Sequence, residues 1–199
     1  MPDNHKIFYH WLDSDDEEVA NIDESPSNVD RKAYLISKGV PCKDWFPENA
    51  EFPLDEDAGM VLTDAIPNSQ LLTIVSAPLK ELLEKHASCD MEFLAIHIRD
   101  HRGQLLENPY YILNVLEKIS CMNREKSDYD ASALDESQVV TFRHLYLDTD
   151  KIPEHTNLFR FGEERDMFMI RQDLMQILID SGMTGLEFTS IKDIGETYR

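Results

Sequence analysis

The chain has 199 residues, 42% of them hydrophobic, so it is long enough to bury a sizeable core in one domain. Its 39 Asp and Glu residues against 19 Lys and Arg residues give a formal net charge of -20, which disfavours binding to nucleic acid or anionic lipid. This charge favours solubility or a basic partner. Three scattered cysteines, Cys42, Cys89 and Cys121, are too few for a disulfide framework, so we expect reduced thiols that fill the core.

The first residues, MPDNHKIFYHWLDSDDEE, lack the basic start and apolar run of a targeting signal, and no apolar run is long enough to span a bilayer. We therefore expect a cytoplasmic protein. Residues 6–12 are rich in aromatic side chains and predict an early strand. Residues 13–30 contain eight Asp or Glu and no Lys or Arg, which predicts a solvated loop or, alternatively, a docking surface for a basic partner.

The rest of the first third consists of short elements and loops. A short element over residues 31–40 ends at Gly39, and Trp45, Phe46 and Phe52 are expected to pack a proline-rich loop onto the core. We divide the chain into an acidic N-terminal extension, residues 1–69, and an α+β domain, residues 70–199.

Regular elements are clearer after residue 70. Residues 70–75 predict a buried strand, and Ser76 followed by Pro78 predicts the start of a helix that ends near Lys85 or His86. Residues 91–99 are apolar at successive positions, which predicts a central strand covered on both faces. The turn Asp100–Gly103 then leads to an antiparallel neighbour over residues 110–116.

The second half adds a short helix over residues 123–129 and several strands. The expected strands cover residues 139–147, 158–161, 168–170 and the segment that starts at Gly185. A helix over residues 172–180 is expected to end with Gly182 in the left-handed conformation.

Two strand-helix-strand units have a similar pattern. With an offset of 95 residues, Leu79 and Leu83 align with Leu174 and Leu178, and Phe93 aligns with Phe188. The similarity is explained either by a duplication or by two independent units with the same periodicity. The predicted fold is a single α+β domain with a mixed or mainly antiparallel sheet and a few packed helices.

No catalytic motif is visible. His97 and His101 lie across a predicted strand and turn, a geometry that does not bring both rings to one metal ion. The sequence has no glycine-rich phosphate loop and no nucleophile elbow. His144 beside Asp148 would suit an acid-base pair, but its alternation with aromatics favours a hydrogen-bonded residue at the edge of the core. We predict no enzyme activity, no cofactor and no metal.

Several residues are expected to have structural roles. Gly185 indicates close packing, Phe159 and Phe188 are expected in the core, and Asn114 is expected to satisfy a neighbouring backbone group. Arg160 and Arg143 would be buried partners of nearby carboxylates.

Four segments together resemble a family of bacterial immunity proteins from polymorphic toxin systems, formerly a domain of unknown function. The resemblance covers residues 70–191. The segments are a strand followed by Ser-x-x-Leu-Lys-x-Leu-Leu (residues 71–83), YYILNV (110–115) with REKS (124–127), LFR (158–160) and TGLEF (184–188). The resemblance implies a cytoplasmic protein that binds and neutralises a cognate toxin by direct contact, without a catalytic site.

A basic toxin would suit the acidic balance, since opposite charges speed encounter. The expected contact residues are acids of two segments: Asp15, Asp16, Glu17 and Glu18 in the first, and the exposed-looking Glu163, Glu164 and Asp166 in the second. The alternatives are an acidic nucleic-acid mimic or adaptor that binds many basic proteins, and an enzyme whose site is assembled from scattered His and acidic residues.

Overall fold

Two mixed sheets form the framework of the computed structural model, which describes residues 7–26, 29, 32–164 and 166–197. The first sheet has the order β12-β1-β11-β10-β7, with β1 Phe8–Asp13, β7 Lys118–Ile119, β10 Leu158–Phe161, β11 Phe168–Arg171 and β12 Leu186–Ser190. The second has the order β2-β5-β6-β4-β3, with β2 Glu51–Pro53, β3 Ala65–Ile66, β4 Thr73–Ser76, β5 Met91–Arg99 and β6 Tyr110–Val115. The pairs β7–β10 and β2–β5 are parallel, and the other pairs in these two sheets are antiparallel. The predicted α+β class with a mixed sheet is confirmed.

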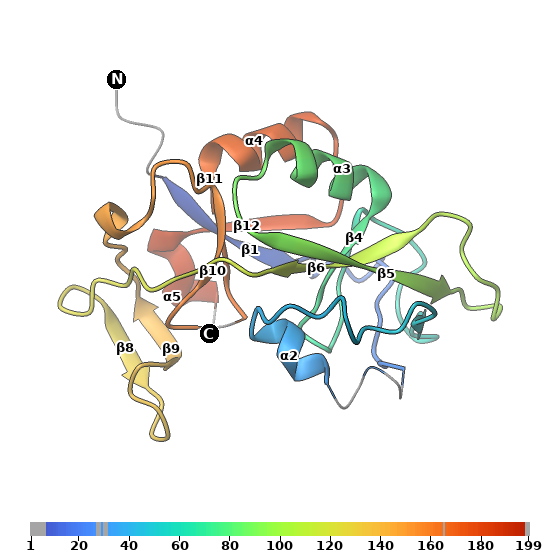
Figure 1. The fold of residues 1–199 in the computed structure, drawn as a ribbon, viewed down its shortest axis with the longest axis horizontal. Coiled ribbons are helices and arrows are strands. Elements are labelled where there is room, and N and C mark those ends of the chain that lie inside the picture. Colours follow the sequence, from blue (N-terminus) through green and yellow to red (C-terminus); the bar gives the residue numbers. More distant parts are fainter. Residues whose placement is uncertain (1–6, 27–28, 30–31, 165, 198–199) are drawn as a thin grey trace.

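Helices α3 (Ala77–His86) and α4 (Gln172–Asp180) lie side by side above the two sheets (Figure 1). The Ser76 hydroxyl accepts a hydrogen bond from the Leu79 N–H at 3.3 Å, so the predicted N-cap of α3 is confirmed. The helices bury Leu79, Leu83, Leu174 and Leu178 in one cluster with apolar residues from both sheets. This shared cluster joins the two sheets into one body.

The two predicted strand-helix-strand units are present with the same arrangement. The starts of β11, α4 and β12 lie 95 residues after those of β4, α3 and β5. In each unit an antiparallel strand lies between the two outer strands: β6 in the first unit and β1 in the second. Strand β6 directly follows its unit in the chain, whereas β1 comes from the far end of the sequence. The structure therefore inserts the N-terminal strand into the centre of the C-terminal unit.

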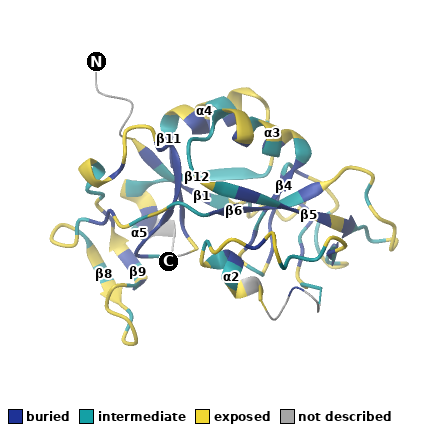
Figure 2. Ribbon diagram, viewed as in Figure 1, coloured by how far each residue is buried: buried dark blue, intermediate teal, exposed yellow. Residues whose placement is uncertain are grey.

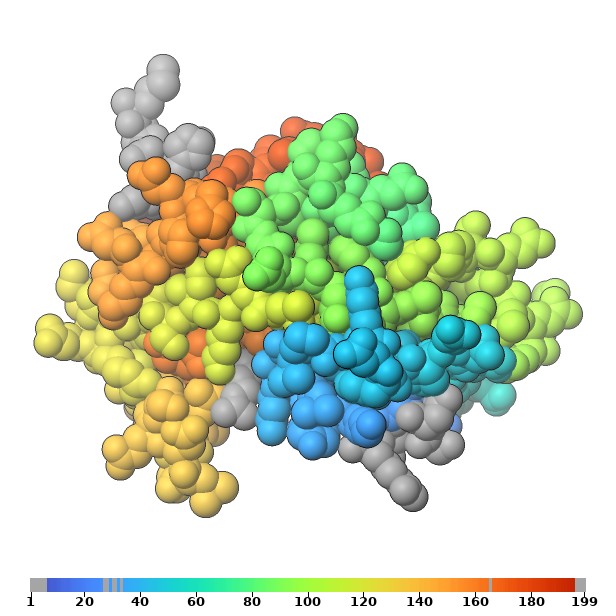
Figure 3. All heavy atoms as spheres, in the orientation of Figure 1, coloured from blue at the N-terminus to red at the C-terminus, as the bar shows by residue number. Residues whose placement is uncertain are grey.

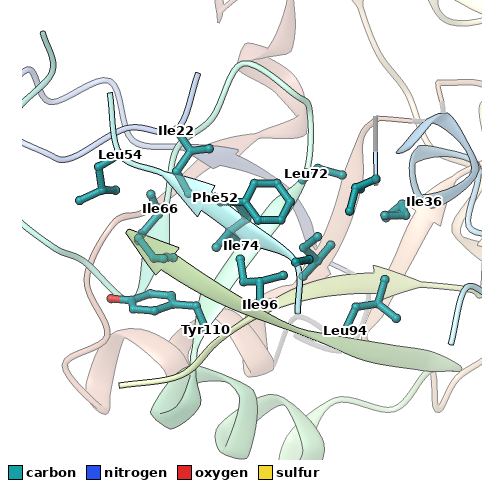
Figure 4. Packing of buried hydrophobic residues seen from close by; sticks show 14 of the residues in the cluster. Ile22, Ile36, Phe52, Leu54, Ile66, Leu72, Ile74, Leu94, Ile96 and Tyr110 are labelled. Carbon is teal, nitrogen blue, oxygen red and sulfur yellow. The ribbon is translucent and has the colours of Figure 1, made fainter. Parts of the chain in front are cut away.

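The other face of the second sheet is covered by residues from the first third of the chain. Figure 4 shows Ile22 and Leu54 packed with Phe52 of β2, Ile74 of β4 and Ile96 of β5. In the space-filling view, α2 (Ala33–Ser37) and the blue-to-cyan segment after it lie against the green residues of the first unit (Figure 3). The division between residues 69 and 70 stays a prediction. Each of the two five-stranded sheets contains strands from both sides of that division.

A hairpin of β8 (Asp128–Ala131) and β9 (Val139–His144) projects from the first sheet (Figures 1 and 3). Most of its residues are exposed (Figure 2). Its base is anchored by Val139 and Phe142, which pack with Phe159 and Phe161 in a third cluster. That cluster also contains Ile194 of the terminal helix α5 (Ile194–Thr197), while a short 3-10 turn at Thr149–Lys151 and another at Ile191–Asp193 complete the fold.

Three predictions about elements are wrong in whole or in part. The buried strand expected over residues 70–75 is β4, which begins only at Thr73, and Leu71 before it is 65% exposed. The expected helix over residues 123–129 is a turn followed by β8, because residues 128–131 pair with β9. The expected burial of both faces of β5 is wrong in part: Met91 and Phe93 on the second face pack against the cluster beneath α3, but the rest of that face is open. Leu94, Ile96 and Ile98 are buried, whereas Ala95 and His97 on the opposite face are exposed.

Several residue predictions are confirmed. Gly182 has φ +74° after α4, and the Asn114 side chain donates to the Val40 carbonyl at 2.8 Å. A Cβ at Gly185 would lie 2.2 Å from the Ala65 carbonyl oxygen, so close packing requires glycine there. Within the described residues, no helix has the length and apolar character needed to cross a membrane.

Candidate functional site

Four consecutive carboxylates lie on an exposed turn directly after β1. We call residues Asp15, Asp16, Glu17 and Glu18 the acidic turn; all four are exposed. Asp16 holds the turn in shape, since its carboxylate accepts the Glu18 N–H at 2.9 Å and its carbonyl accepts the Val19 N–H at 3.0 Å. At the other end, the Asp15 N–H donates to the Glu187 carboxylate of β12 at 3.1 Å. The backbone of the turn is thus fixed while its charges face solvent.

The acidic turn lies against an apolar strip, which we define as Met60, Val61 and Leu62. The Val61 N–H donates to the Glu18 carbonyl and the Ala20 N–H donates to the Val61 carbonyl, both at 2.9 Å. All three side chains of the strip are exposed, and Met60 is 70% exposed. An apolar centre bordered by charged groups is the usual composition of a protein-binding surface.

Glycine makes this contact possible. A Cβ at Gly59 would lie 2.1 Å from the carbonyl oxygen of Glu18, a distance that two nonbonded atoms do not reach. The backbone of the acidic turn therefore rests directly on the segment that precedes the apolar strip.

The second predicted group of acids is divided by the fold. Glu163 is only 6% exposed, so the expectation of an exposed carboxylate is wrong for this residue. It follows β10 and points inward, where its carboxylate accepts the Met122 N–H at 3.3 Å and its carbonyl accepts the Val139 N–H at 2.8 Å. Glu164 is half-buried and Asp166 is exposed. Contact with a partner stays a prediction for all seven acids.

Glu164 and Asp166 line a cavity of about 440 Å³ together with Asp13, the last residue of β1. Leu71 and Val140 also line this cavity, and they are 65% and 68% exposed. The acids of the connection between β10 and β11 thus meet the end of β1. Asp13 is also electrostatically coupled to Glu187, the residue that holds the acidic turn.

Burial perturbs two ionisable side chains of β1 that line this cavity. Asp13 is exposed as a residue, but desolvation of its carboxyl group in the concave surface raises its pKa to about 6, against a smaller opposing effect of the Asn68 N–H. Burial lowers the pKa of His10 to about 4. At neutral pH the His10 ring is therefore uncharged and the Asp13 carboxylate is a destabilised anion.

The other described side chains that could take part in catalysis or metal binding are not arranged for it. Burial raises the pKa of the Cys89 and Cys121 thiols to about 12 in each case, which keeps them protonated. His144 is exposed rather than at the edge of the core, and Asp148 pairs with Lys151 at 3.2 Å. Among the described residues, no group of three or more His, Cys, Asp or Glu side chains is arranged to hold a metal ion.

The family model of the immunity protein family Imm11 matches residues 10–193. The chain belongs to the Imm11 family. The match confirms the family resemblance of the second two thirds and extends it to the acidic N-terminal third, where the sequence alone showed none. Among curated proteins, none matches the chain.

Several residues on the candidate surface of this Imm11 family member were not predicted as contact residues from the sequence. Asp13 lay in the predicted acidic loop, Leu71 and Val140 lay in predicted strands, and the apolar strip lay in a loop. A usable signal was present at residues 60–62, where three large apolar residues follow Gly59 in a segment without regular structure. Asp13, Leu71 and Val140 had no such signal, because the fold brings them together from distant parts of the chain.

Proposed function

We propose that this protein binds a cognate bacterial toxin in the cytoplasm of the producing cell and neutralises it by direct contact. The observation that carries this proposal is the Imm11 family match over residues 10–193. The toxin is expected to be basic where it contacts this protein, since the chain has a net charge of -20. Binding in place of catalysis accounts for a surface that combines carboxylates with exposed apolar side chains.

The acidic turn and the apolar strip are suited to different parts of recognition. Exposed carboxylates attract a basic partner over about 8–10 Å at physiological salt, which speeds encounter. Met60, Val61 and Leu62 would then lose their exposed apolar surface to the partner, and this burial slows dissociation.

Rescue of toxicity tests the proposal. The toxin domain encoded beside this gene is expressed with and without this protein, and the complex is purified at moderate salt. We expect growth only when both proteins are present, together with a stable complex of one toxin and one immunity protein. Death despite good expression of this protein would reject the neighbouring toxin as its target.

An unrelated basic protein, cytochrome c, serves as the specificity control. A dedicated immunity protein binds its toxin far more tightly than it binds cytochrome c at the same ionic strength. Comparable binding to both would favour the alternative of an acidic mimic or general adaptor.

A further inference from the structure

The cavity beside β1 is assembled from four separate parts of the chain. Its lining comes from the end of β1, residues 71–73 before β4, the start of β9, and the connection between β10 and β11. Two of these parts belong to different sheets and one to the projecting hairpin. A cavity of about 440 Å³ is within the range of about 300–1,000 Å³ that is typical of ligand pockets.

Its lining combines two chemical features. Leu71 and Val140 expose more than half of their apolar side chains. Asp13, Glu164 and Asp166 provide three carboxyl groups, whereas the described lining residues include no Lys or Arg. His10 adds no positive charge at neutral pH because burial lowers its pKa to about 4.

The conformation and exposure of Leu71 do not favour the stability of the fold. Its φ of +56° lies in the left-handed region, where a branched apolar side chain is strained, and the side chain is largely in solvent. Trp11, a further lining residue, is buried, and its indole N–H has no hydrogen-bond partner within the described part of the chain. A side chain inserted into the cavity would cover Leu71.

We propose that this cavity receives an arginine or lysine side chain from the toxin, with the alkyl stem against Leu71 and Val140 and the cationic group at Asp13. This inference rests on the proposed function and specifies the chemistry of the contact. Lys and Arg combine an apolar stem with a charged end, as the lining requires. An acidic insert would be repelled by Asp13, and an apolar insert would cover the Asp13 carboxylate without supplying a cation.

Charge pairing gives the interaction a pH dependence. The groups around the cationic end are Asp13 and His10 of β1, Glu187 of β12, and Glu164 and Asp166 of the β10–β11 connection; the buried Arg160 of β10 also interacts electrostatically with Asp166. Because burial raises the pKa of Asp13 to about 6, this carboxyl group is largely neutral at pH 5 and charged at pH 7.5. Binding of the cation is therefore weaker at pH 5.

Leu71→Asn is the sharpest test. Asn tolerates the left-handed conformation better than Leu, so the variant is expected to fold with an equal or higher melting temperature. It also removes the apolar contact, and we expect its affinity for the toxin, measured by calorimetry, to fall by about tenfold or more. The matched control is Leu134→Asn, since Leu134 is 99% exposed on the hairpin loop and does not line the cavity.

Asp13→Asn completes the set because it removes the charge with little change in shape. We expect it to weaken toxin binding at pH 7.5 and to abolish most of the difference between pH 5 and pH 7.5. Unchanged toxin affinity in both Leu71→Asn and Asp13→Asn would overturn the cavity proposal, while the proposed immunity function would stand.

A second measurement does not depend on the toxin. N-acetyl-arginine methylamide is titrated into the labelled protein and followed by NMR, with N-acetyl-norleucine methylamide as the uncharged control. We expect chemical-shift changes at cavity residues with the arginine compound that are absent with norleucine and reduced in Asp13→Asn. Equal or absent shifts with both compounds would overturn the proposal, whether or not the toxin forms a complex.

Discussion

Arg160 connects three parts of the protein through one buried side chain. Its guanidinium donates to the carbonyls of Val115 in β6 and Ile36 in α2, and it lies 4.5 Å from the ring of Phe168. Burial lowers its pKa to about 10, so it stays charged at neutral pH. The expectation of a buried arginine is confirmed for Arg160, but it is wrong for Arg143, which is exposed and pairs with Asp128 and Asp130 of β8.

Arg160→Met is expected to lower the free energy of unfolding by about 2–4 kcal/mol, because it removes the buried charged hydrogen bonds to the Val115 and Ile36 carbonyls and the contact with the Phe168 ring. Urea denaturation measures the change. Arg143→Met is the control, and its midpoint should hardly move because its ion pairs are exposed to solvent. Similar losses in both variants would contradict this role of Arg160.

His10 makes stability depend on pH. Its pKa is about 4 in the fold and about 6.5 in the unfolded chain, so the unfolded state binds more protons between these values. His10 does not reduce the free energy of unfolding above pH 6.5. As the pH falls to 4, the free energy of unfolding decreases by up to about 3 kcal/mol because the unfolded state binds the proton more tightly. Asp13 acts in the opposite direction, since its raised pKa makes the folded state bind the proton more tightly.

His10→Gln isolates the histidine contribution because Asp13 is unchanged. We expect the loss of stability between pH 7 and pH 5 to be smaller in the variant than in the wild type, as measured by urea denaturation at both pH values. An identical pH dependence in the two proteins would show that His10 does not titrate in this way.

The acidic turn offers a test of charge alone. Replacing Asp15, Glu17 and Glu18 with Lys keeps Asp16, whose carboxylate holds the turn. We expect weaker toxin binding, a smaller dependence of affinity on salt and a nearly unchanged melting temperature. The control with the same net charge replaces Glu107, Glu125 and Glu136, which are exposed elsewhere. Equal affinity in the two triple variants would remove the acidic turn from the interface.

Elements with a local signal were predicted well. Ser76 and Pro78 indicated the start of α3, Gly182 indicated the end of α4, and the strand at residues 91–99 was predicted with its observed bounds. Features that depend on distant partners were not predictable in this way. The hairpin strand β8 is stabilised by β9, and the burial of Glu163 depends on Met122 and Val139 from other segments.

Gly59→Ala tests the position of the acidic turn without changing any charge. The added Cβ would overlap the Glu18 carbonyl, so the turn must shift away from the apolar strip. We expect toxin affinity to fall, with NMR shifts at residues 15–20 and 59–62. Gly103→Ala provides a control, because a Cβ there meets no atom within 4 Å, although its positive φ costs some stability. If the turn shifts and the affinity for the toxin is unchanged, the position of the acidic turn does not matter for binding.

At the scale of the whole molecule, the described residues before residue 70 contribute to both sheets and to the core. They supply β1 to the centre of the first sheet, β2 with Phe52 and β3 to the two edges of the second sheet, and Ile22 and Leu54 to the layer below it. The sequence predicted β1 as a strand, but it carried no information about the partners of β1, because β11 and β12 lie at the opposite end of the chain.

A fragment of residues 70–199 is therefore expected to lack a cooperative unfolding transition, since its first sheet has lost the strand between β11 and β12. Circular dichroism with urea titration, with the full chain as reference, measures this. A cooperative transition in the fragment would instead support an independent domain that starts at residue 70.

The central place of β1 also determines when the protein is ready to act. During translation β1 leaves the ribosome well before its partners, because Asp13 pairs with Leu186 and Trp11 pairs with Phe188, which lie more than 170 residues later in the chain. At about 5–20 residues per second, β1 waits on the order of 10–35 s for its partners. Under the proposed function, a toxin made at the same moment would meet an incomplete partner, and protection would depend on molecules that were finished before the toxin appeared.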